Sequence, residues 1–353
     1  MNRPSVPFAL LRYSWCFVMQ MLGVAVHGAP WGRNPDRIGE SVREVNLSFA
    51  IGLSLPQDIV LPNTAELRWM WMWLRGYEAQ HLALVSAVLR SACAGGGDPT
   101  LVDSGANEGT WTLLAAAFGC HAVAVEPQPL CVRELRRTLA RNAALKPRVT
   151  IHQNMLWPHV TSALFRTSGS CSGDASFVPE SDGANSSSFV RSTSRHGGAV
   201  PGRVHSRSLD AIFGAHVRRS AQILLWHVDV EGAEMRVLDS ASSLFAAGRI
   251  ERVLVELMAE RWAKVGVRLE SGLAVGRRLF AGWACVVTCT GEPFRWREPL
   301  YGSPARRRRC DERLQGKPWV LFAVDVYCVH PKSIDGDAGL AALSAMLPPP
   351  LRG

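Results

Sequence analysis

One stretch of the sequence, from Leu101 to Leu114, carries residue types that suit ligand binding. A short apolar run, typical of a buried strand, ends at Asp103, and a helix is predicted from Thr110 to Phe118. A strand, an acid, a glycine-containing loop and a helix in this order are typical of a ligand site at the carboxyl end of a strand. Backbone N–H groups at the start of such a helix are free to bind a ligand. The candidate ligand-binding residues of this stretch are Asp103, Gly105, Ala106, Asn107 and Gly109.

The charge of the loop indicates which ligand it binds. A dinucleotide site usually has the pattern G-x-G-x-x-G, which lets a pyrophosphate approach bare backbone. Here the loop lacks that pattern, follows Asp103 and contains Glu108, and these carboxylates would repel a pyrophosphate. S-adenosylmethionine carries an ammonium and a sulfonium and no phosphate, so we predict it as the cofactor. The alternatives are a nicotinamide dinucleotide, which the charges disfavour, and a purely structural turn with Asn107 capping the helix.

Two further residues are predicted to contact the same cofactor. The strand His121–Val125 ends at Glu126, which lies 23 residues after Asp103, close to the offset of about 20 residues seen for ribose-binding carboxylates. A carboxylate can accept hydrogen bonds from both hydroxyls of a ribose. The next strand, residues 148–153, leads to Asn154, at a position that borders the adenine pocket in an open α/β sheet.

A second acidic stretch runs from Ile223 to Glu234. Strand alternation places His227, Asp229 and Glu231 on one side of the chain. So many acids at one strand end are unfavourable unless they meet a cation, a metal or a polar ligand. We predict Asp229 or Glu231 as a general base, with His227 as the next candidate, since its unperturbed pKa of about 6.5 suits neutral pH. The alternatives are acids that bind a metal and acids that only cap the following helix.

The order of elements predicts an α/β fold with a mostly parallel sheet. Strands and helices alternate from residue 100 to residue 281. The last two apolar runs, Trp283–Thr290 and Trp319–Val329, have only an Arg-rich loop between them, which fits an antiparallel hairpin at the sheet edge. The Ser- and Gly-rich residues 168–201 are predicted to be an inserted loop or lid, with short strands at Phe177-Val178 and Ser188–Val190.

Two motifs of this chain resemble those of the FkbM-type S-adenosylmethionine-dependent methyltransferases. They are Val102-Asp-Ser-Gly-Ala-Asn-Glu-Gly109, followed by Val125-Glu-Pro127, and Val228-Asp-Val-Glu-Gly-Ala-Glu234, followed by Leu254-Val-Glu256. The resemblance covers roughly residues 98–260. It implies a Rossmann-like sheet of seven strands with helices on both faces. It also implies methyl transfer to an oxygen, often a hydroxyl of a sugar or secondary metabolite, so that the expected partner is a small-molecule or glycan acceptor.

The chain departs from the family at one position of the second motif. Members often carry Lys two residues before the Asp, whereas this chain has His227. The departure motivates an alternative function, a non-catalytic binding or scaffold protein built on a methyltransferase fold.

Regions outside this domain give further expectations. Residues 1–30 contain the apolar run Tyr13–Val26, which resembles a signal peptide or short membrane anchor, although its 14 residues are fewer than the roughly 20 of a spanning helix. We expect the secretory pathway or a membrane if this segment acts so, and the cytoplasm otherwise. Residues 31–95 are predicted to be an extension with a Trp-rich segment and a helix, 96–330 the methyltransferase domain, and 331–353 a peripheral C-terminal tail.

Charge and cysteine content argue against two other classes of function. The net charge of +9 includes the block Arg306–Arg309, but no aromatic-rich motif accompanies it, so we predict no specific nucleic-acid binding. The nine cysteines are scattered and odd in number, and no C-x-x-C pair occurs. We therefore predict no metal ligands of zinc type and no disulfide framework, with Cys285 and Cys289 as core residues of a strand.

Overall fold

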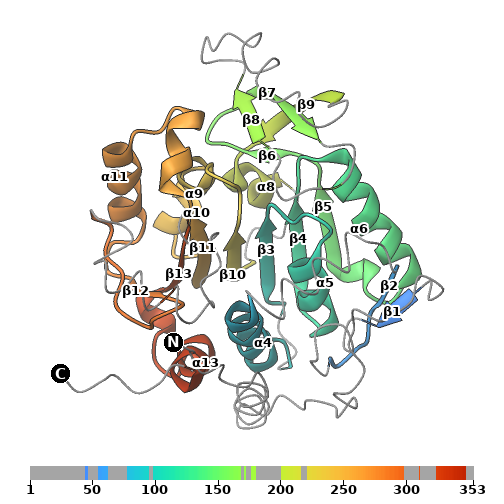
Figure 1. The fold of residues 1–353 in the computed structure, drawn as a ribbon. Helices are drawn as coiled ribbons and strands as arrows, with labels where there is room; N and C mark the ends of the chain where they lie inside the picture. Colours follow the sequence, from blue (N-terminus) through green and yellow to red (C-terminus); the bar gives the residue numbers. More distant parts are fainter. Residues whose placement is uncertain are drawn as a thin grey trace, which may run out of the picture.

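A seven-stranded sheet forms the centre of the computed structural model, which describes residues 44–46, 55–62, 78–94, 98–167, 171, 176–179, 200–215, 221–297, 310 and 323–346. The strands lie in the order β12-β13-β11-β10-β3-β4-β5 (Figure 1). From one edge to the other they are β12 (Ala284–Val287), β13 (Val324–Val329), β11 (Arg252–Leu257), β10 (Ile223–Val228), β3 (Thr100–Ser104), β4 (His121–Val125) and β5 (Val149–His152). Only β13 runs antiparallel to both of its neighbours. The predicted Rossmann-like α/β fold with a terminal antiparallel hairpin is thus confirmed.

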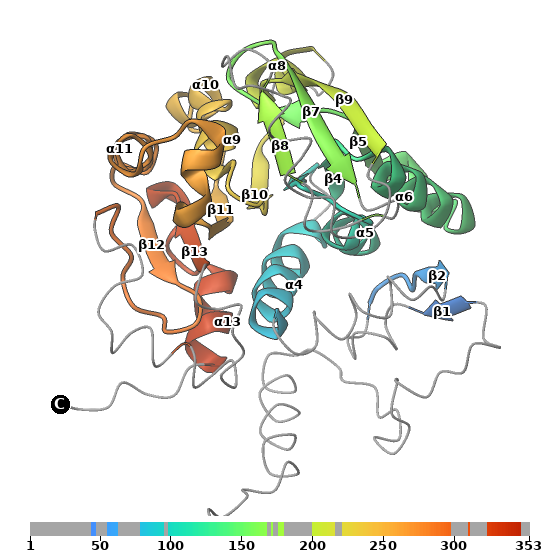
Figure 2. The same cartoon turned by 45° about the horizontal axis from the view of Figure 1, so that its top comes forward.

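Helices cover both faces of this sheet (Figure 2). Because successive side chains of a strand point to opposite faces, Leu101 enters one apolar core and Val102 the other. The first core contains residues of α4 (Ala79–Cys93), α5 (Thr110–Ala117), α6 (Pro129–Arg141) and α13 (Ala338–Met346). The second contains residues of α8 (Leu209–Ala215), α9 (Glu234–Asp239), α10 (Ser242–Ala246) and α11 (Leu269–Leu279).

Residues 234–247 form two short helices, α9 and α10, and not one continuous helix. The Ser240 hydroxyl donates to the carbonyl of Val237 at 2.6 Å, a local bond that competes with continuation of the helix. Asp210 then caps α10 from outside, since its carboxylate accepts the N–H groups of Ser243 and Leu244, both at 3.0 Å. A contact between distant segments therefore fixes the start of the second helix, which local periodicity could not predict.

A small second sheet is inserted between β5 and α8. Its strands, in the order β6-β9-β7-β8, are β6 (Met155–Leu156), β9 (Val200–Arg207), β7 (Ser162–Thr167) and β8 (Ser176–Pro179). Figure 1 shows it above the central strands, near the start of α6. The predicted strand at Phe177-Val178 belongs to β8, whereas the one predicted at Ser188–Val190 lies outside the described residues. The insertion begins earlier than residue 168, because β6 and β7 precede it.

The prediction of no disulfide framework is wrong. Eight cysteines form four disulfides, which are Cys93–Cys120, Cys131–Cys171, Cys285–Cys328 and Cys289–Cys310. The paired residues are 21 to 43 positions apart in sequence, so only the fold brings them together. Cys285 and Cys289 are buried as expected, but Cys285 lies opposite Cys328 on the antiparallel hairpin and is bonded to it.

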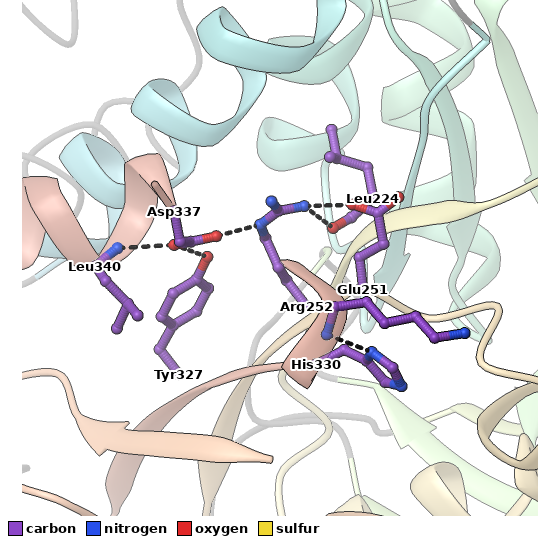
Figure 3. Close-up of polar contacts among 8 residues, drawn as sticks. Leu224, Glu251, Arg252, Tyr327, His330, Asp337 and Leu340 are labelled. Carbon is purple, nitrogen blue, oxygen red and sulfur yellow. Dashed lines mark hydrogen bonds and ion pairs between the residues drawn. The ribbon is translucent and has the colours of Figure 1, made fainter. Parts of the chain in front are cut away.

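Residues beyond Pro331, expected to be peripheral, contribute to the core. Asp337 is buried and accepts hydrogen bonds from Arg252 Nε at 2.6 Å, from the Tyr327 hydroxyl at 3.0 Å and from the Leu340 N–H at 2.8 Å (Figure 3). Burial and the charge of Asp337 raise the pKa of Tyr327. This carboxylate therefore joins β11, β13 and the start of α13.

The predicted helix within residues 31–95 is α4, but other predictions for the two ends of the chain fall outside the described residues. These include the segment Tyr13–Val26, the Trp-rich segment around Trp71 and, near the C-terminus, the arginines 306–309. Among the helices that the structure describes, none is both long and apolar enough to cross a bilayer.

Replacing Asp337 by Ala is expected to lower the free energy of unfolding by about 3 kcal/mol, because it removes the buried carboxylate partner of Arg252 and leaves this guanidinium with only the more exposed Glu251. Asp335→Ala, at an exposed position two residues earlier, should change stability by less than about 0.5 kcal/mol. Urea denaturation followed by tryptophan fluorescence measures both. Equal stabilities of the two variants would show that the Asp337 contacts contribute nothing.

Candidate active site

The glycine loop after β3 has a backbone that few residues other than glycine can adopt. Gly105 and Gly109 have φ angles of 78° and 87°, and Asn107 has a φ of 52°. A Cβ on Gly105 would lie 1.8 Å from the backbone oxygen of Asp229. Gly105 therefore allows the loop to lie directly against the start of the second acidic stretch, so the two sequence motifs form one site.

Glu126 organises the floor of this site from the end of β4. Its carboxylate accepts the N–H of Asn107 at 2.9 Å and the N–H of Gln128 at 2.8 Å. The side chain is buried, and burial raises its pKa to about 7 in spite of these two bonds. Each carboxylate oxygen can accept a second hydrogen bond, so Glu126 retains capacity for the two hydroxyls of a ribose.

A cleft brings together six of the ten predicted site residues. It is lined by Ser104, Gly105, Asn107, Val125, Glu126, Pro127, Gln128, Asn154, Met155, Leu156, Asp229, Val230, Glu231, Ala233 and Val237. The Asn154 side chain donates to the carbonyl of His205, in β9 of the inserted sheet, at 3.1 Å. Ala106 and Gly109 belong to the same loop but are not among the lining residues. The arrangement fits S-adenosylmethionine, since bare loop backbone, a carboxylate with room for the hydroxyls of a ribose, and apolar side chains that could contact adenine lie next to one another.

Asp103 and His227 lie together beneath the loop, outside the lining of the cleft. Asp103 is fully buried, and one of its oxygens accepts both the N–H and the hydroxyl of Thr112, at 3.0 and 2.7 Å. Its other oxygen lies 3.1 Å from Nδ1 of His227. Burial works to lower the pKa of His227, but the hydrogen bond and charge of Asp103 outweigh it, so this pKa is raised. Asp103 thus holds the start of α5 and orients His227.

A layer of acids continues from Asp229 across the ends of β11 and β13. Glu256 and Asp325 face each other in the antiparallel register. Burial, and next the charges of Asp229 and Asp325, raise the pKa of Glu256 well above its ordinary value. Burial raises the pKa of Asp325 to about 7. His81 of α4 lies 3.6 Å from Asp325, and burial followed by the charge of His227 lowers its pKa to about 3.

Glu231 lies beside this layer and forms an ion pair with Arg261. It has a φ of 56°, and Arg261 donates to its carboxylate. A Cβ on the neighbouring Gly232 would lie 2.5 Å from the Cβ of Arg261, which explains the glycine there.

Oxygen atoms of Asp229, Glu231 and Glu256 lie within 4.8 Å of one another, a set that could ligate a divalent cation.

Sequence reasoning missed two members of the layer, Asp325 and His81. Asp325 lies near the amino end of β13. Because β13 runs antiparallel to β11, this end lies beside the carboxyl ends of the parallel strands, where the other acids lie. The predicted hairpin could have located it, whereas the position of His81 depends on how α4 packs.

Comparison with known proteins decides the family of this site. Residues 103–271 match the model described as the methyltransferase FkbM domain. This segment is an FkbM methyltransferase domain. The match agrees with S-adenosylmethionine as the cofactor, which the loop charges predicted. No curated protein matches the chain.

Solved structures of methyltransferases also align with the chain. A methyltransferase FkbM from Methylobacillus flagellatus KT is 13% identical, with 74% of this chain and 60% of that chain covered and a TM-score of 0.36. WbdD is 12% identical, with coverages of 73% and 42% and a TM-score of 0.36. A SAM-dependent methyltransferase from Agrobacterium tumefaciens is 9% identical, with coverages of 82% and 71% and a TM-score of 0.37. The chain thus spans less than two thirds of the first two proteins.

Binding of the nucleoside part of the cofactor is expected to strengthen as pH rises through about 7, where Glu126 ionises. Hydroxyls donate to the carboxylate and not to the protonated acid, so the folded-state pKa falls on binding and a proton is released. The probe is 5′-methylthioadenosine, which has the ribose and adenine but no amino or carboxyl group that titrates nearby. Affinity should fall about tenfold from pH 8 to pH 6.

Isothermal titration in two buffers of different ionisation enthalpy measures the affinity and the released proton. Glu126→Gln should bind more weakly and with little pH dependence over this range. A wild-type affinity that is the same at pH 6 and pH 8 would contradict the assignment of Glu126.

The Cys131–Cys171 disulfide is expected to support the cofactor loop. It joins α6 to the insertion and packs against Asn107, whose Oδ1 lies 3.4 Å from Sγ of Cys131. Replacing both cysteines by Ser should weaken S-adenosylmethionine binding roughly 3- to 10-fold, because Asn107 loses this support. The matched variant without the Cys93–Cys120 disulfide, which lies at the other end of the strands, should bind as the wild type does. Equal affinities of the two variants in calorimetry would exclude this role.

Proposed function

We propose that this methyltransferase methylates a hydroxyl oxygen of a sugar or secondary-metabolite-like acceptor, either a small molecule or a glycan. The observation that carries the proposal is the position of Asp229. Its backbone packs against Gly105 of the cofactor loop, and its Oδ1 is buried without a hydrogen-bond partner among the described residues. An acceptor hydroxyl donating to this oxygen would lie beside the cofactor.

The charge of the cleft supports a neutral, hydroxyl-rich acceptor. Three of the residues that line the cleft, Glu126, Asp229 and Glu231, carry carboxyl groups, and Arg261 is engaged by Glu231. Carboxylates accept hydrogen bonds from hydroxyl groups and repel phosphate or carboxylate acceptors. The raised pKa values of Glu256 and Asp325 keep the combined negative charge low enough for burial.

The reaction needs alignment and removal of one proton. Bound S-adenosylmethionine supplies an electrophilic methyl carbon and a neutral thioether leaving group. An acceptor oxygen lone pair forms the new O–C bond while the C–S bond breaks, so much of the catalysis comes from positioning the two partners in line. We propose that Asp229 accepts the proton of the acceptor hydroxyl as a general base. Such a base typically raises the rate by about 10²–10⁴-fold.

Glu231 and His227 have supporting roles in this proposal. The ion pair with Arg261 occupies Glu231, so that it shapes the turn after Asp229. Asp103 engages Nδ1 of His227, whose raised pKa favours a positive charge near the acids. His227 in the place of the family's usual Lys therefore keeps a group at this position that can carry a positive charge.

Two measurements on the full chain test the proposal. Calorimetry should show micromolar binding of S-adenosylmethionine, with the demethylated product binding at least as well. A screen of neutral glycans and polyols with methyl-labelled cofactor should then show transfer that Asp229→Asn reduces by at least about 100-fold while cofactor affinity stays within about twofold.

Glu260→Gln, at an exposed position next to Arg261, is the matched control and should keep wild-type turnover. Wild-type turnover in Asp229→Asn would remove Asp229 from the mechanism. Tight cofactor binding without transfer to any acceptor class would favour the alternative, a binding or scaffold protein.

A further inference from the structure

The disulfides indicate the compartment in which this protein folds. Eight of its nine cysteines are paired, and the ninth, Cys16, lies outside the described residues. Three of the pairs have Cα–Cα distances of 5.2, 4.7 and 5.4 Å, inside the range of about 4.4–6.8 Å that a disulfide needs. Such complete pairing is typical of proteins that mature in an oxidising compartment and is rare in the cytosol.

The four bonds are spread over the whole domain. They join α4 to the start of β4, α6 to the insertion, β12 to β13, and the segment after β12 to Cys310. One pair of neighbouring cysteines can result from packing alone. Four pairs in different parts of the domain indicate that the whole chain folds under oxidising conditions.

An exposed glycosylation sequon stands on the same domain. Asn46-Leu47-Ser48 has the pattern N-x-[ST], which is an acceptor for N-linked glycans only in the secretory pathway. Asn46 is exposed on β1 (Glu44–Asn46), the outer strand of a two-stranded ribbon with β2 (Val60–Pro62). Exposure on an edge strand gives a transferase and a glycan free access.

The ribbon is fixed to the domain at a point remote from the cleft. The side chain of Asn142 accepts the N–H of Val60 at 2.9 Å and donates to its carbonyl at 2.8 Å. Asn142 follows the last residue of α6, whereas Gln128, just before the first, lines the cleft. The helix of 13 residues is about 20 Å long, so it separates a glycan on Asn46 from the cofactor (Figure 1).

We propose that this methyltransferase matures in the oxidising lumen of the secretory pathway and carries an N-linked glycan on Asn46. The inference rests on the cysteine pairs and the sequon and not on the acceptor proposed above. It implies that the acceptor is a molecule present in that lumen or outside the cell.

The experiment uses the full chain with its own N-terminus, produced in eukaryotic cells. Free thiols are blocked with N-ethylmaleimide before reduction, and we expect no more than one blocked cysteine of the nine. Peptide-N-glycosidase in ¹⁸O-water should convert Asn46 to labelled Asp. Asn46→Gln and Ser48→Ala should each lose one glycan mass, whereas Ser48→Thr, which preserves the sequon, should retain it. The variant Asn185→Gln distinguishes a glycan on Asn46 from one on the second sequon, Asn185-Ser-Ser.

Two results would overturn the inference. If Asn46 is unmodified in a chain whose disulfides have formed, the proposed glycosylation is contradicted. If most thiols are free, the proposed maturation in an oxidising compartment is contradicted. S-adenosylmethionine affinity should be the same before and after glycan removal, since the ribbon and the cleft lie at opposite ends of α6; a change of tenfold would contradict this placement.

Discussion

The buried carboxylate of Asp103 is the constraint on which the cofactor site depends. Its oxygens accept two hydrogen bonds from Thr112 at the start of α5 and contact His227 of β10. These partners satisfy a charge that would otherwise be costly to bury, and in return the charge fixes two strands and a helix relative to one another. The loop between Asp103 and Thr112 is then closed at both ends, so that its glycines and Asn107 adopt one shape against Asp229 and Glu126.

One face of the sheet changes from apolar to polar along its strands. Near their middle, Leu101, Leu225 and Leu254 pack in the apolar core below α4 and α5. Two residues further on, the same face carries Asp103, His227 and Glu256. The alternation of a strand keeps these residues on one side, so the polar layer is continuous with the core and borders the cleft. Burial is the largest cause of the shifted pKa values of Glu256 and of its neighbours His81 and Asp325.

Local patterns predicted the fold and the cofactor well because these depend on interactions between residues that are close together in the sequence. The apolar runs before Asp103, Glu126 and Asp229 form neighbouring strands, and Gly105 and Gly109 have the positive φ that their loop requires. What the sequence left unpredicted depends on distant contacts. Asp210 caps the start of α10, more than 30 residues later, and Cys131 meets Cys171 only because the insertion folds back onto α6. Asp103 was expected to contact the cofactor directly, but its depth beneath the loop depends on how β3 and β10 align.

The position of β13 has a consequence for synthesis of the chain. Within the central sheet β12 pairs only with β13, and β13 also pairs with β11, yet β13 comes last in the sequence among the described strands. Until residue 329 leaves the ribosome, β11 has an open edge and β12 has no neighbour to join. Co-translational folding therefore stops at a five-stranded intermediate, from β5 to β11, that lacks Asp325 and the Cys285–Cys328 bond. During translation such an intermediate exposes an unpaired strand, a target for chaperones.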